Sequence, residues 1–480
     1  MSEVKLKRVL GLPTAIATVV GLIICNTALV SAGQGFGIAG LGFIIPMSLA
    51  LLLNLFVAFS FGELSSIMPR AGGIGQYTMP AMGPLASLFA VISGYVIVSI
   101  FAGSAEISIP GLIINEIFLP NIPVGFISLI MLFVILACNL RGIEFFAILQ
   151  MTSAIVKIGS VVGLGLIGLL LAQTNSGLPL QPLLESASGM NPLGWGVISL
   201  TALAFWMFVG VEFVCPLAEE IKNPERNIPI AMLVSLLILF ITNVLFGLAA
   251  LKHVPMSQLA SSAAPHVDVA TALLGRAGQY IIAIVAIFAS LGTVNSLIAS
   301  ISRMLYGMAK EGQLPKIFGV LHPKYQTPTF AILFMGACFF LPIFTGVATI
   351  EAIVILILSA AFSWFVAYII GHLDVIILRM KYPNATRPIK SPLYPLPQLL
   401  GIAGMIYLMF NIFPDPEVKR QIYIFALGFL AIGLIGCTLL VKFVMKKNLF
   451  EVTSMEEVVK NISSDRDDVH SDKTKTSLDT

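Results

Sequence analysis

The chain has 480 residues, of which 58% are hydrophobic and 11% charged, and its formal net charge is +3. Soluble domains carry about a quarter charged residues, so this composition excludes a water-soluble globular protein and predicts an all-α integral membrane protein in a lipid bilayer. The small positive charge is not gathered into a basic stripe with interleaved aromatic residues, which excludes nucleic acid as a partner.

Apolar segments long enough to cross ~30 Å of hydrocarbon recur along the chain and predict about twelve transmembrane helices. Residues 1–12 precede the first one, which is too long for a signal peptide and has Asn26 in its middle. The predicted helices cover residues 13–37, 42–67, 84–112, 123–140, 145–172, 194–218, 228–252, 278–308, 328–346, 350–379, 395–413 and 421–444.

The basic residues flanking these helices predict their orientation. If residues 1–12 are cytoplasmic, only Lys252, Arg276, Lys419 and Arg420 among the flanking basic residues fall outside. The positive-inside rule therefore predicts a multi-pass protein of the cell (inner) membrane with both termini in the cytoplasm. From about Lys446 the sequence turns polar and charged, so residues 445–480 are predicted to form a disordered tail.

The five cysteines lie within apolar segments, and none has a CxxC partner or a histidine at metal-ligand spacing. We therefore predict no disulfide framework, no metal site and no cofactor.

The first and sixth predicted helices are interrupted. The first contains Gly21 and then Cys25-Asn26-Thr27, and the sixth contains Gly210 and Glu212 before Pro216. Corresponding broken helices in two halves are typical of transporters, whose freed backbone groups and half-helix ends bind substrate. The alternative that these glycines and prolines only serve helix packing stays open, above all for the first helix. The breaks predict substrate-binding residues at Ile24, Cys25, Asn26, Thr27, Val209 and Gly210.

Three ionisable residues, Glu106, Lys157 and Glu212, lie deep in apolar segments. A charge in mid-membrane costs about 2.5–3.5 kcal/mol on insertion scales, so each is a functional candidate. Lys157 and Glu212 are predicted to serve proton coupling or gating, with a purely structural role as the alternative. Glu106 is predicted to face the substrate and pair with a cation on it, or else to form a buried ion pair with Lys157.

Hydroxyl groups line one face of the eighth predicted helix. Thr293, Ser296 and Ser300 are spaced at i, i+3 and i+7 and therefore share that face. Two interpretations stay open: the stripe faces Lys157, with Thr293 and Ser296 assisting coupling, or it only joins helices by hydrogen bonds.

Residues 205–212 (FWMFVGVE) and 217–229 (LAEEIKNPERNIP) resemble the helix 6 signature of the amino acid/polyamine/organocation (APC) transporters. Residues 68–73 (MPRAGG), 311–318 (EGQLPKIF) and 387–395 (RPIKSPLYP) continue the resemblance. It implies two inverted repeats of five helices, in residues 13–172 and 194–379, followed by two helices in residues 395–444. It also implies that Trp206 covers the substrate and that Lys157 stands where sodium-coupled transporters of the same fold bind a cation.

The resemblance further implies a function. The expected activity is sodium-independent secondary transport of amino acids by alternating access, as proton-coupled symport or as exchange, and not an enzymatic one. In helix 1, however, Cys25-Asn26-Thr27 replaces the glycines that the family usually carries there, which favours an amine such as ethanolamine or a polyamine as the alternative substrate. A transporter-like membrane sensor also stays open, as does the choice between monomer and homodimer.

Overall fold

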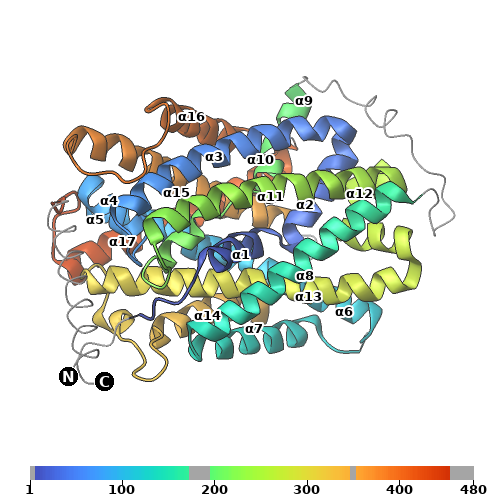
Figure 1. The fold of residues 1–480 in the computed structure, drawn as a ribbon, viewed down its shortest axis with the longest axis horizontal. Coiled ribbons are helices and arrows are strands. Elements are labelled where there is room, and N and C mark those ends of the chain that lie inside the picture. The colour runs from blue at the N-terminus through green and yellow to red at the C-terminus, as the bar shows by residue number, and fades with distance from the viewer. Residues whose placement is uncertain (1–5, 120, 172–194, 346–352, 414, 455–480) are drawn as a thin grey trace, which may run out of the picture.

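The computed structural model describes residues 6–119, 121–171, 195–345, 353–413 and 415–454. Within these ranges the chain is helical and contains no strand, apart from one isolated parallel bridge between Leu10 and Ile221. Figure 1 shows long helices running side by side in a bundle. The all-α prediction is confirmed for the described residues.

The first part of the chain forms the following elements, of which η1 is a 3-10 helix and η2 and η3 are π-helices. They are α1 (Leu12–Ile23), α2 (Asn26–Ala39), η1 (Gly40–Phe43), α3 (Ile44–Ile67), α4 (Ile74–Met82), α5 (Pro84–Val91), η2 (Ile92–Ile97), η3 (Ser99–Gly103), α6 (Ser104–Ile117), α7 (Val124–Leu140) and α8 (Ile143–Leu170).

In the second part, η5 and η6 are 3-10 helices and η7 is a π-helix. The elements are α9 (Trp195–Ile198), α10 (Thr201–Phe205), η5 (Val211–Leu217), α11 (Pro224–His253), α12 (Met256–Ser261), α13 (Pro265–Lys310), η6 (Lys316–Gly319), α14 (Thr329–Phe344), α15 (Ile353–Lys381), α16 (Leu396–Phe410), α17 (Pro416–Leu439) and η7 (Leu440–Met445).

Helix lengths fit a membrane protein. Among the described residues, seven segments are long and apolar enough to span a membrane, and five further apolar helices are shorter. One of the seven, 26–67, contains both α2 and α3, because the short helix η1 joins them without a gap. Every predicted helix range overlaps helical structure, while the number of membrane crossings and the two repeats remain predictions.

Two regions differ from the predicted helices for local reasons. In α13, Gly275 is non-helical, with φ 58°, and separates the predicted helix near residue 278 from a preceding helix that begins at Pro265 and was not predicted; Pro265 suits its first turn. The third predicted helix runs to Ile117 and includes the two π-helical segments η2 and η3 just before Glu106. Such π segments are common at functional sites.

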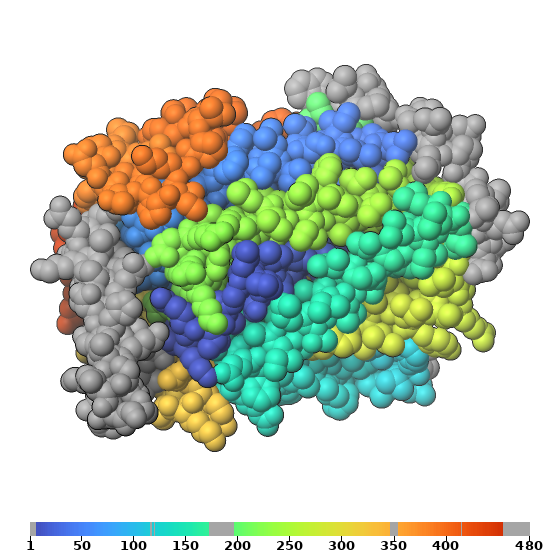
Figure 2. All heavy atoms as spheres, in the orientation of Figure 1, coloured from blue at the N-terminus to red at the C-terminus, as the bar shows by residue number. Residues whose placement is uncertain are grey.

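The outer surface is apolar, as a lipid-facing surface must be. Helix α8 has one exposed apolar face and one buried polar face. Ile148 and Ile155 are each 66% exposed, whereas Gln150, Ser153 and Lys157 are fully buried. Figure 2 shows the side chains of α3, α11 and α8 forming one continuous surface on the face in view. The polar residues of α8 therefore point into the bundle.

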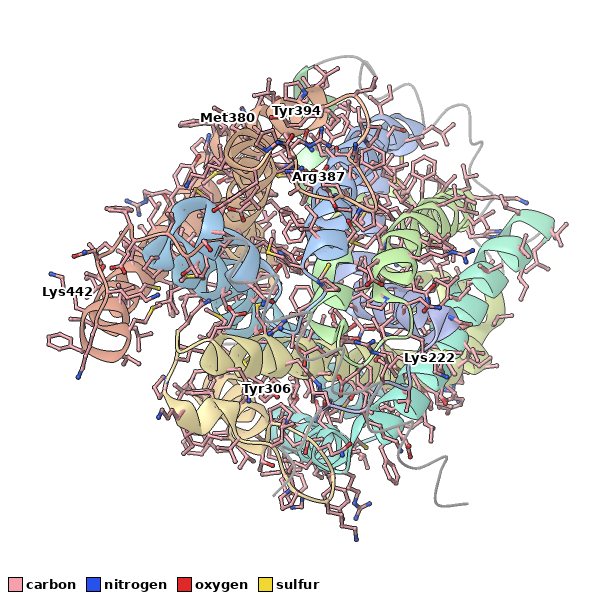
Figure 3. The ribbon with its side chains drawn as sticks, turned by 60° about the vertical axis from the view of Figure 1, so that its left-hand side comes forward. Lys222, Tyr306, Met380, Arg387, Tyr394 and Lys442 are labelled. Carbon is pink, nitrogen blue, oxygen red and sulfur yellow. The ribbon has the colours of Figure 1, made fainter. Side chains whose placement is uncertain are left out.

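Ion pairs fasten one end of the bundle, which comes forward in Figure 3. There the Glu63 carboxylate of α3 accepts a hydrogen bond from Arg379 Nε at 2.8 Å and from the Ser391 amide at 2.7 Å, and Arg387 Nε lies 3.2 Å from it. The charge pattern assigns this end to the cytoplasm. The Leu85 amide also donates to the Leu449 carbonyl, so the first part of the predicted tail packs on α5; residues 455–480 lie outside the described residues.

Candidate functional site

Both predicted breaks are present, and they are built differently. Between α1 and α2 only Ile24 and Cys25 leave the helix, and Cys25 Sγ caps α2 by accepting the Ala28 amide at 3.3 Å. Helix 6 stops at Phe205 and resumes at Val211, with Gly210 at φ 104°, a left-handed conformation that side chains disfavour. A Cβ at position 210 would also lie 2.8 Å from Leu22 of α1, so the two breaks pack directly on each other.

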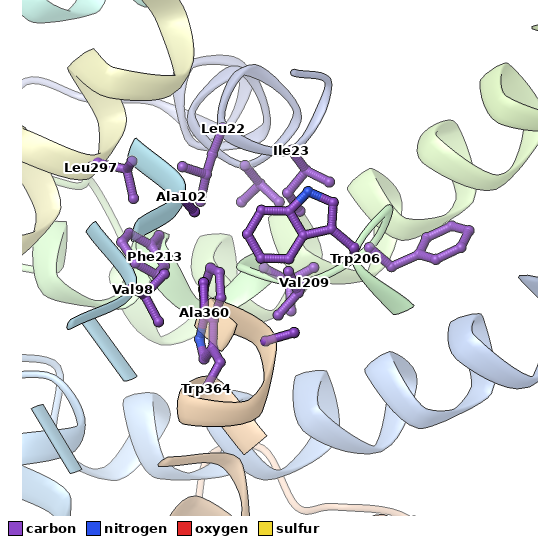
Figure 4. Packing of buried hydrophobic residues seen from close by; sticks show 14 of the residues in the cluster. Leu22, Ile23, Val98, Ala102, Trp206, Val209, Phe213, Leu297, Ala360 and Trp364 are labelled. Carbon is purple, nitrogen blue, oxygen red and sulfur yellow. The ribbon is translucent and has the colours of Figure 1, made fainter. Parts of the chain in front are cut away.

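A small cavity of about 30 Å³ lies between the breaks. Figure 4 shows side chains from α1, the π-helical region, helix 6, α13 and α15 converging around it. Its lining residues are Leu22, Ile23, Cys25, Thr27, Val98, Ala102, Glu106, Trp206, Val209, Thr293, Leu297 and Trp364. This volume has room for roughly two water molecules, so a larger ligand fits only after side chains or half-helices move.

Trp206 and Trp364 close the cavity from two elements. The Trp206 indole donates from Nε1 to the Thr27 hydroxyl at 3.1 Å and meets the Trp364 ring edge to face, with centroids 6.1 Å apart. Trp206 therefore contacts α2 across the cavity, the position from which an aromatic residue can cover a ligand. Phe205 and Phe208 are fully buried in packing contacts on either side.

The Glu106 carboxylate binds the beginning of α2. Its Oε1 accepts the Asn26 amide at 3.0 Å and its Oε2 accepts the Thr27 amide at 3.0 Å. The Asn26 side chain and Ser290 Oγ also reach Oε1, at 3.0 and 3.1 Å. Glu106 thus pairs with the positive end of the α2 dipole. It does not form the ion pair with Lys157 that the sequence allowed as an alternative.

Lys157 binds the end of α1. Its ammonium donates to the Gly21 carbonyl at 2.6 Å and to Thr293 Oγ1 at 3.2 Å, and Thr293 in turn donates to the Leu22 carbonyl at 2.9 Å. Gly292 makes room for it, since a Cβ there would lie 2.9 Å from Lys157 Nζ. Lys157 and Thr293 therefore satisfy the Gly21 and Leu22 carbonyl groups, which the break in helix 1 leaves without helical partners.

Glu212 lies outside the cavity lining, behind Trp364. Trp364 Nε1 donates to its Oε1 at 3.0 Å and the Tyr368 hydroxyl to its Oε2 at 2.6 Å, while the Gly210 amide donates to the same hydroxyl at 3.0 Å. Glu212 thus joins the helix 6 break to α15 through side chains.

The remaining predicted residues have positions of their own. Ser296 donates to the Thr18 carbonyl at 3.3 Å and Ser300 to the Phe213 carbonyl at 2.6 Å, so of the hydroxyl stripe only Thr293 meets Lys157. Ile24, Asn26 and Gly210 flank the cavity without lining it. The stripe therefore joins α13 to both broken helices.

Sequence reasoning missed Ser290, Trp364 and Tyr368. Ser290 stands one turn before Thr293, and Trp364 and Tyr368 stand one turn apart on α15. Two aromatic residues with polar tips at i and i+4 in an apolar helix are a usable signal, because buried Trp and Tyr groups need hydrogen-bond partners.

A buried ion pair and several backbone hydrogen bonds meet at Glu220, just after η5. Arg303 of α13 donates from Nε to Glu220 Oε2 at 3.0 Å, and both side chains are almost fully buried. Burial raises the pKa of Glu220, and the Arg303 charge opposes that shift. The Glu220 carbonyl accepts the Val9 and Leu10 amides, and the Lys222 amide donates to Leu10. The segments before α1 and after η5 are thereby fastened to one another.

Comparison with known proteins gives a consistent result. A family model described as "Amino acid permease" matches residues 10–435. The human cystine/glutamate transporter is 26% identical over 426 residues, covering 86% of this chain and 82% of its own. A branched-chain amino acid permease of Bacillus subtilis is 26% identical over 438 residues (85% and 89%), and a glutamate/serine transporter of the same organism is 29% identical over 420 residues (80% and 74%).

Proposed function

The chain belongs to the amino acid permease family of membrane transporters, and from this premise we propose that it carries amino acids across the cell membrane by alternating access. The cavity between the two breaks is the observation that carries this proposal. It is lined by buried side chains, it lies at the ends of half-helices whose dipoles suit a zwitterion, and it is too small for substrate in this conformation.

We propose that transport is independent of sodium. The Lys157 ammonium already donates to the Gly21 carbonyl and to Thr293 Oγ1. A coupling cation bound at this place would need the same two oxygens as ligands. A sodium ion there would add a second positive charge beside a buried one, which is costly. Coupling then falls to protons or to exchange, with Lys157 and Glu212 as the candidate proton carriers.

On the Glu220 side, which the charge pattern predicts to be cytoplasmic, backbone hydrogen bonds join the segment before α1 to the segment after η5. Substrate release on that side requires the segment before α1 to part from Glu220 and Lys222, since their backbone hydrogen bonds hold the first half-helix in place. We propose this orientation, with both termini cytoplasmic, for a protein that acts as a monomer or a homodimer.

Uptake by proteoliposomes tests the proposal. We expect saturable uptake and counterflow of at least one labelled amino acid, unchanged when sodium is replaced by potassium. Neither a channel nor a transporter-like sensor would show counterflow, so its absence for all twenty amino acids would refute amino acid transport.

The same assay tests proton coupling. Lys157→Ala and Glu212→Gln proteins should fold and yet lose accumulation driven by an imposed pH gradient, because each removes a buried proton-binding group. Glu144→Gln, at an exposed residue paired with Lys7, is the matched control. If both variants accumulate substrate with the wild-type pH dependence, exchange replaces proton coupling as the mechanism.

A second candidate substrate is an amine such as ethanolamine or a polyamine. It is favoured by the helix 1 break, where Cys25, Asn26 and Thr27 bring side chains to the place where a glycine would leave bare amides. A thermal-shift screen of the purified protein against amino acids, ethanolamine and polyamines separates the candidates, because a ligand of the native state raises its apparent stability.

A further inference from the structure

The anion site at the beginning of α2 is already filled by the protein itself. The amides of Asn26 and Thr27, which point along the axis of a 14-residue helix, are the groups that would bind a substrate carboxylate. Both are taken by Glu106, each at 3.0 Å. A substrate carboxylate therefore meets an internal carboxylate in its place.

These contacts favour the ionised form of Glu106. Backbone N–H groups are obligate donors, and one of them faces each oxygen of Glu106, an arrangement that suits the ionised carboxylate. Ser290 and the Asn26 side chain add further donors on Oε1. On Oε2 the Thr27 amide is the one hydrogen bond found among the described residues, which leaves a second acceptor position on that oxygen.

The surroundings give this negative charge no mobile cation. Lys157 is bound to Gly21 and Thr293, and Cys25 is the nearest titratable group on the α1–α2 junction, where its sulfur caps α2. Glu106 itself lines the cavity together with apolar side chains such as Val98, Ala102 and Leu297. A ligand that enters therefore meets the Glu106 charge among mostly apolar side chains, while the Lys157 ammonium stays behind Thr293, bound to the Gly21 carbonyl.

Three ligand classes fare differently in such a cavity. An ammonium group reaches the open position on Oε2 and forms a charge-assisted hydrogen bond. A zwitterion places its ammonium there as well, and its carboxylate shares or takes over the α2 amides while Glu106 keeps a cationic partner. An anion without an ammonium group leaves two negative charges in a desolvated site, an arrangement that costs several kcal/mol.

We propose that Glu106 determines the specificity of this site. Because of Glu106, binding requires the ammonium group of the substrate and does not require its carboxylate. The inference rests on the proposed function, since it concerns the same cavity. It concerns binding rather than movement across the membrane, so the two can fail separately.

Binding to the purified full-length protein tests the inference. All twenty amino acids, ethanolamine and putrescine are screened by thermal shift, and each amino acid that binds is compared with the amine lacking its carboxylate and the acid lacking its ammonium. For leucine these are 3-methylbutylamine and 4-methylpentanoate. We expect the amine to bind within about tenfold of the amino acid and the acid to lose at least about 30-fold, the lower range for an unpaired buried charge.

Glu106→Gln should reverse this order, because the variant removes the negative charge while keeping the side-chain size: the acid gains affinity relative to the amine. Glu106→Asp keeps the charge and should keep the ammonium requirement, which guards against a Gln variant that does not fold. Glu417→Gln, an exposed glutamate on α17, is the matched control and should leave the order unchanged.

Each outcome decides the matter. A wild-type protein that binds the deaminated acid as well as the amino acid, or that binds no ammonium compound at all, overturns the inference, and so does an unchanged ligand order in a folded Glu106→Gln protein. Binding that follows the predicted order without any uptake by proteoliposomes would leave the inference standing and refute the proposed transport.

Discussion

The two broken helices satisfy their freed backbone groups in opposite ways. At the helix 1 break, charged side chains from elsewhere bind the backbone: Glu106 binds the amides of α2 and Lys157 the carbonyl of Gly21. At the helix 6 break, the segment brings its own charge, Glu212, and the side chains of Trp364 and Tyr368 bind it. At the first break, backbone groups beside the cavity are thus bound by charged side chains, whereas the second break holds its own charge behind aromatic rings.

The difference suggests a division of labour. Carbonyl and amide dipoles at the helix 1 break are fixed in space and suit recognition of a charged ligand. The helix 6 break has a left-handed glycine and a longer non-helical stretch, which suit movement. Ligand contacts should therefore depend on helix 1 and conformational change on helix 6.

The largest effect is expected at Glu220, where α13 binds the segment that follows the helix 6 break. Arg303→Gln leaves Glu220 buried without its cation, and losing one partner of a buried ion pair costs about 3–5 kcal/mol. Chemical unfolding of the protein in detergent would measure this loss. Arg420→Gln disrupts the exposed pair with Glu417 and should cost less than about 1 kcal/mol. Equal losses of unfolding free energy in the two variants would show that the buried pair stabilises the fold no more than the exposed pair does.

Gly210→Ala tests whether the helix 6 break needs its left-handed residue. The φ of 104° costs an L-residue roughly 1–3 kcal/mol, and the new Cβ would lie 2.8 Å from Leu22 and 3.2 Å from Trp364. We expect uptake by proteoliposomes to fall at least about tenfold. Gly159→Ala on α8 introduces a Cβ with nothing within 4 Å and should transport normally. Normal transport by Gly210→Ala would show that the helix 6 break does not need a left-handed residue for its movement.

The smallest expected effect is a difference in unfolding free energy between two variants that each lose one tryptophan hydrogen bond. Trp364→Phe removes a donor to the Glu212 carboxyl group, a bond of about 1.5–3 kcal/mol when that group is ionised, whereas Trp206→Phe removes a donor to the neutral Thr27 hydroxyl, a bond of about 0.5–1.5 kcal/mol. Unfolding free energies of both variants would be compared directly, since the change in ring size is the same. A larger loss for Trp206→Phe would argue that Glu212 is held by Tyr368 alone.

Local sequence was sufficient for the helices and for the positions of the breaks. Apolar segments report their own length, and Gly210 marks the helix 6 break at its own position because its backbone is left-handed. Gly21 and Pro216 only lie near the breaks, since Gly21 is still within α1 and Pro216 is within η5. Capping is equally local: Asp415 accepts the amides of Glu417 and Val418 at the beginning of α17, with Pro416 in the first turn. The family signature in residues 205–229 also lies within one segment.

Tertiary structure decided what each charged side chain binds. The sequence singled out Glu106 and Lys157 as buried charges but left open whether they pair with one another, since their partners lie on other helices. In the folded chain Glu106 binds amides 79 and 80 residues away and Lys157 a carbonyl 136 residues away. Such pairings depend on how helices pack and not on helical period, so the occupied anion site and the screening of Glu212 by Trp364 and Tyr368 became visible only in three dimensions.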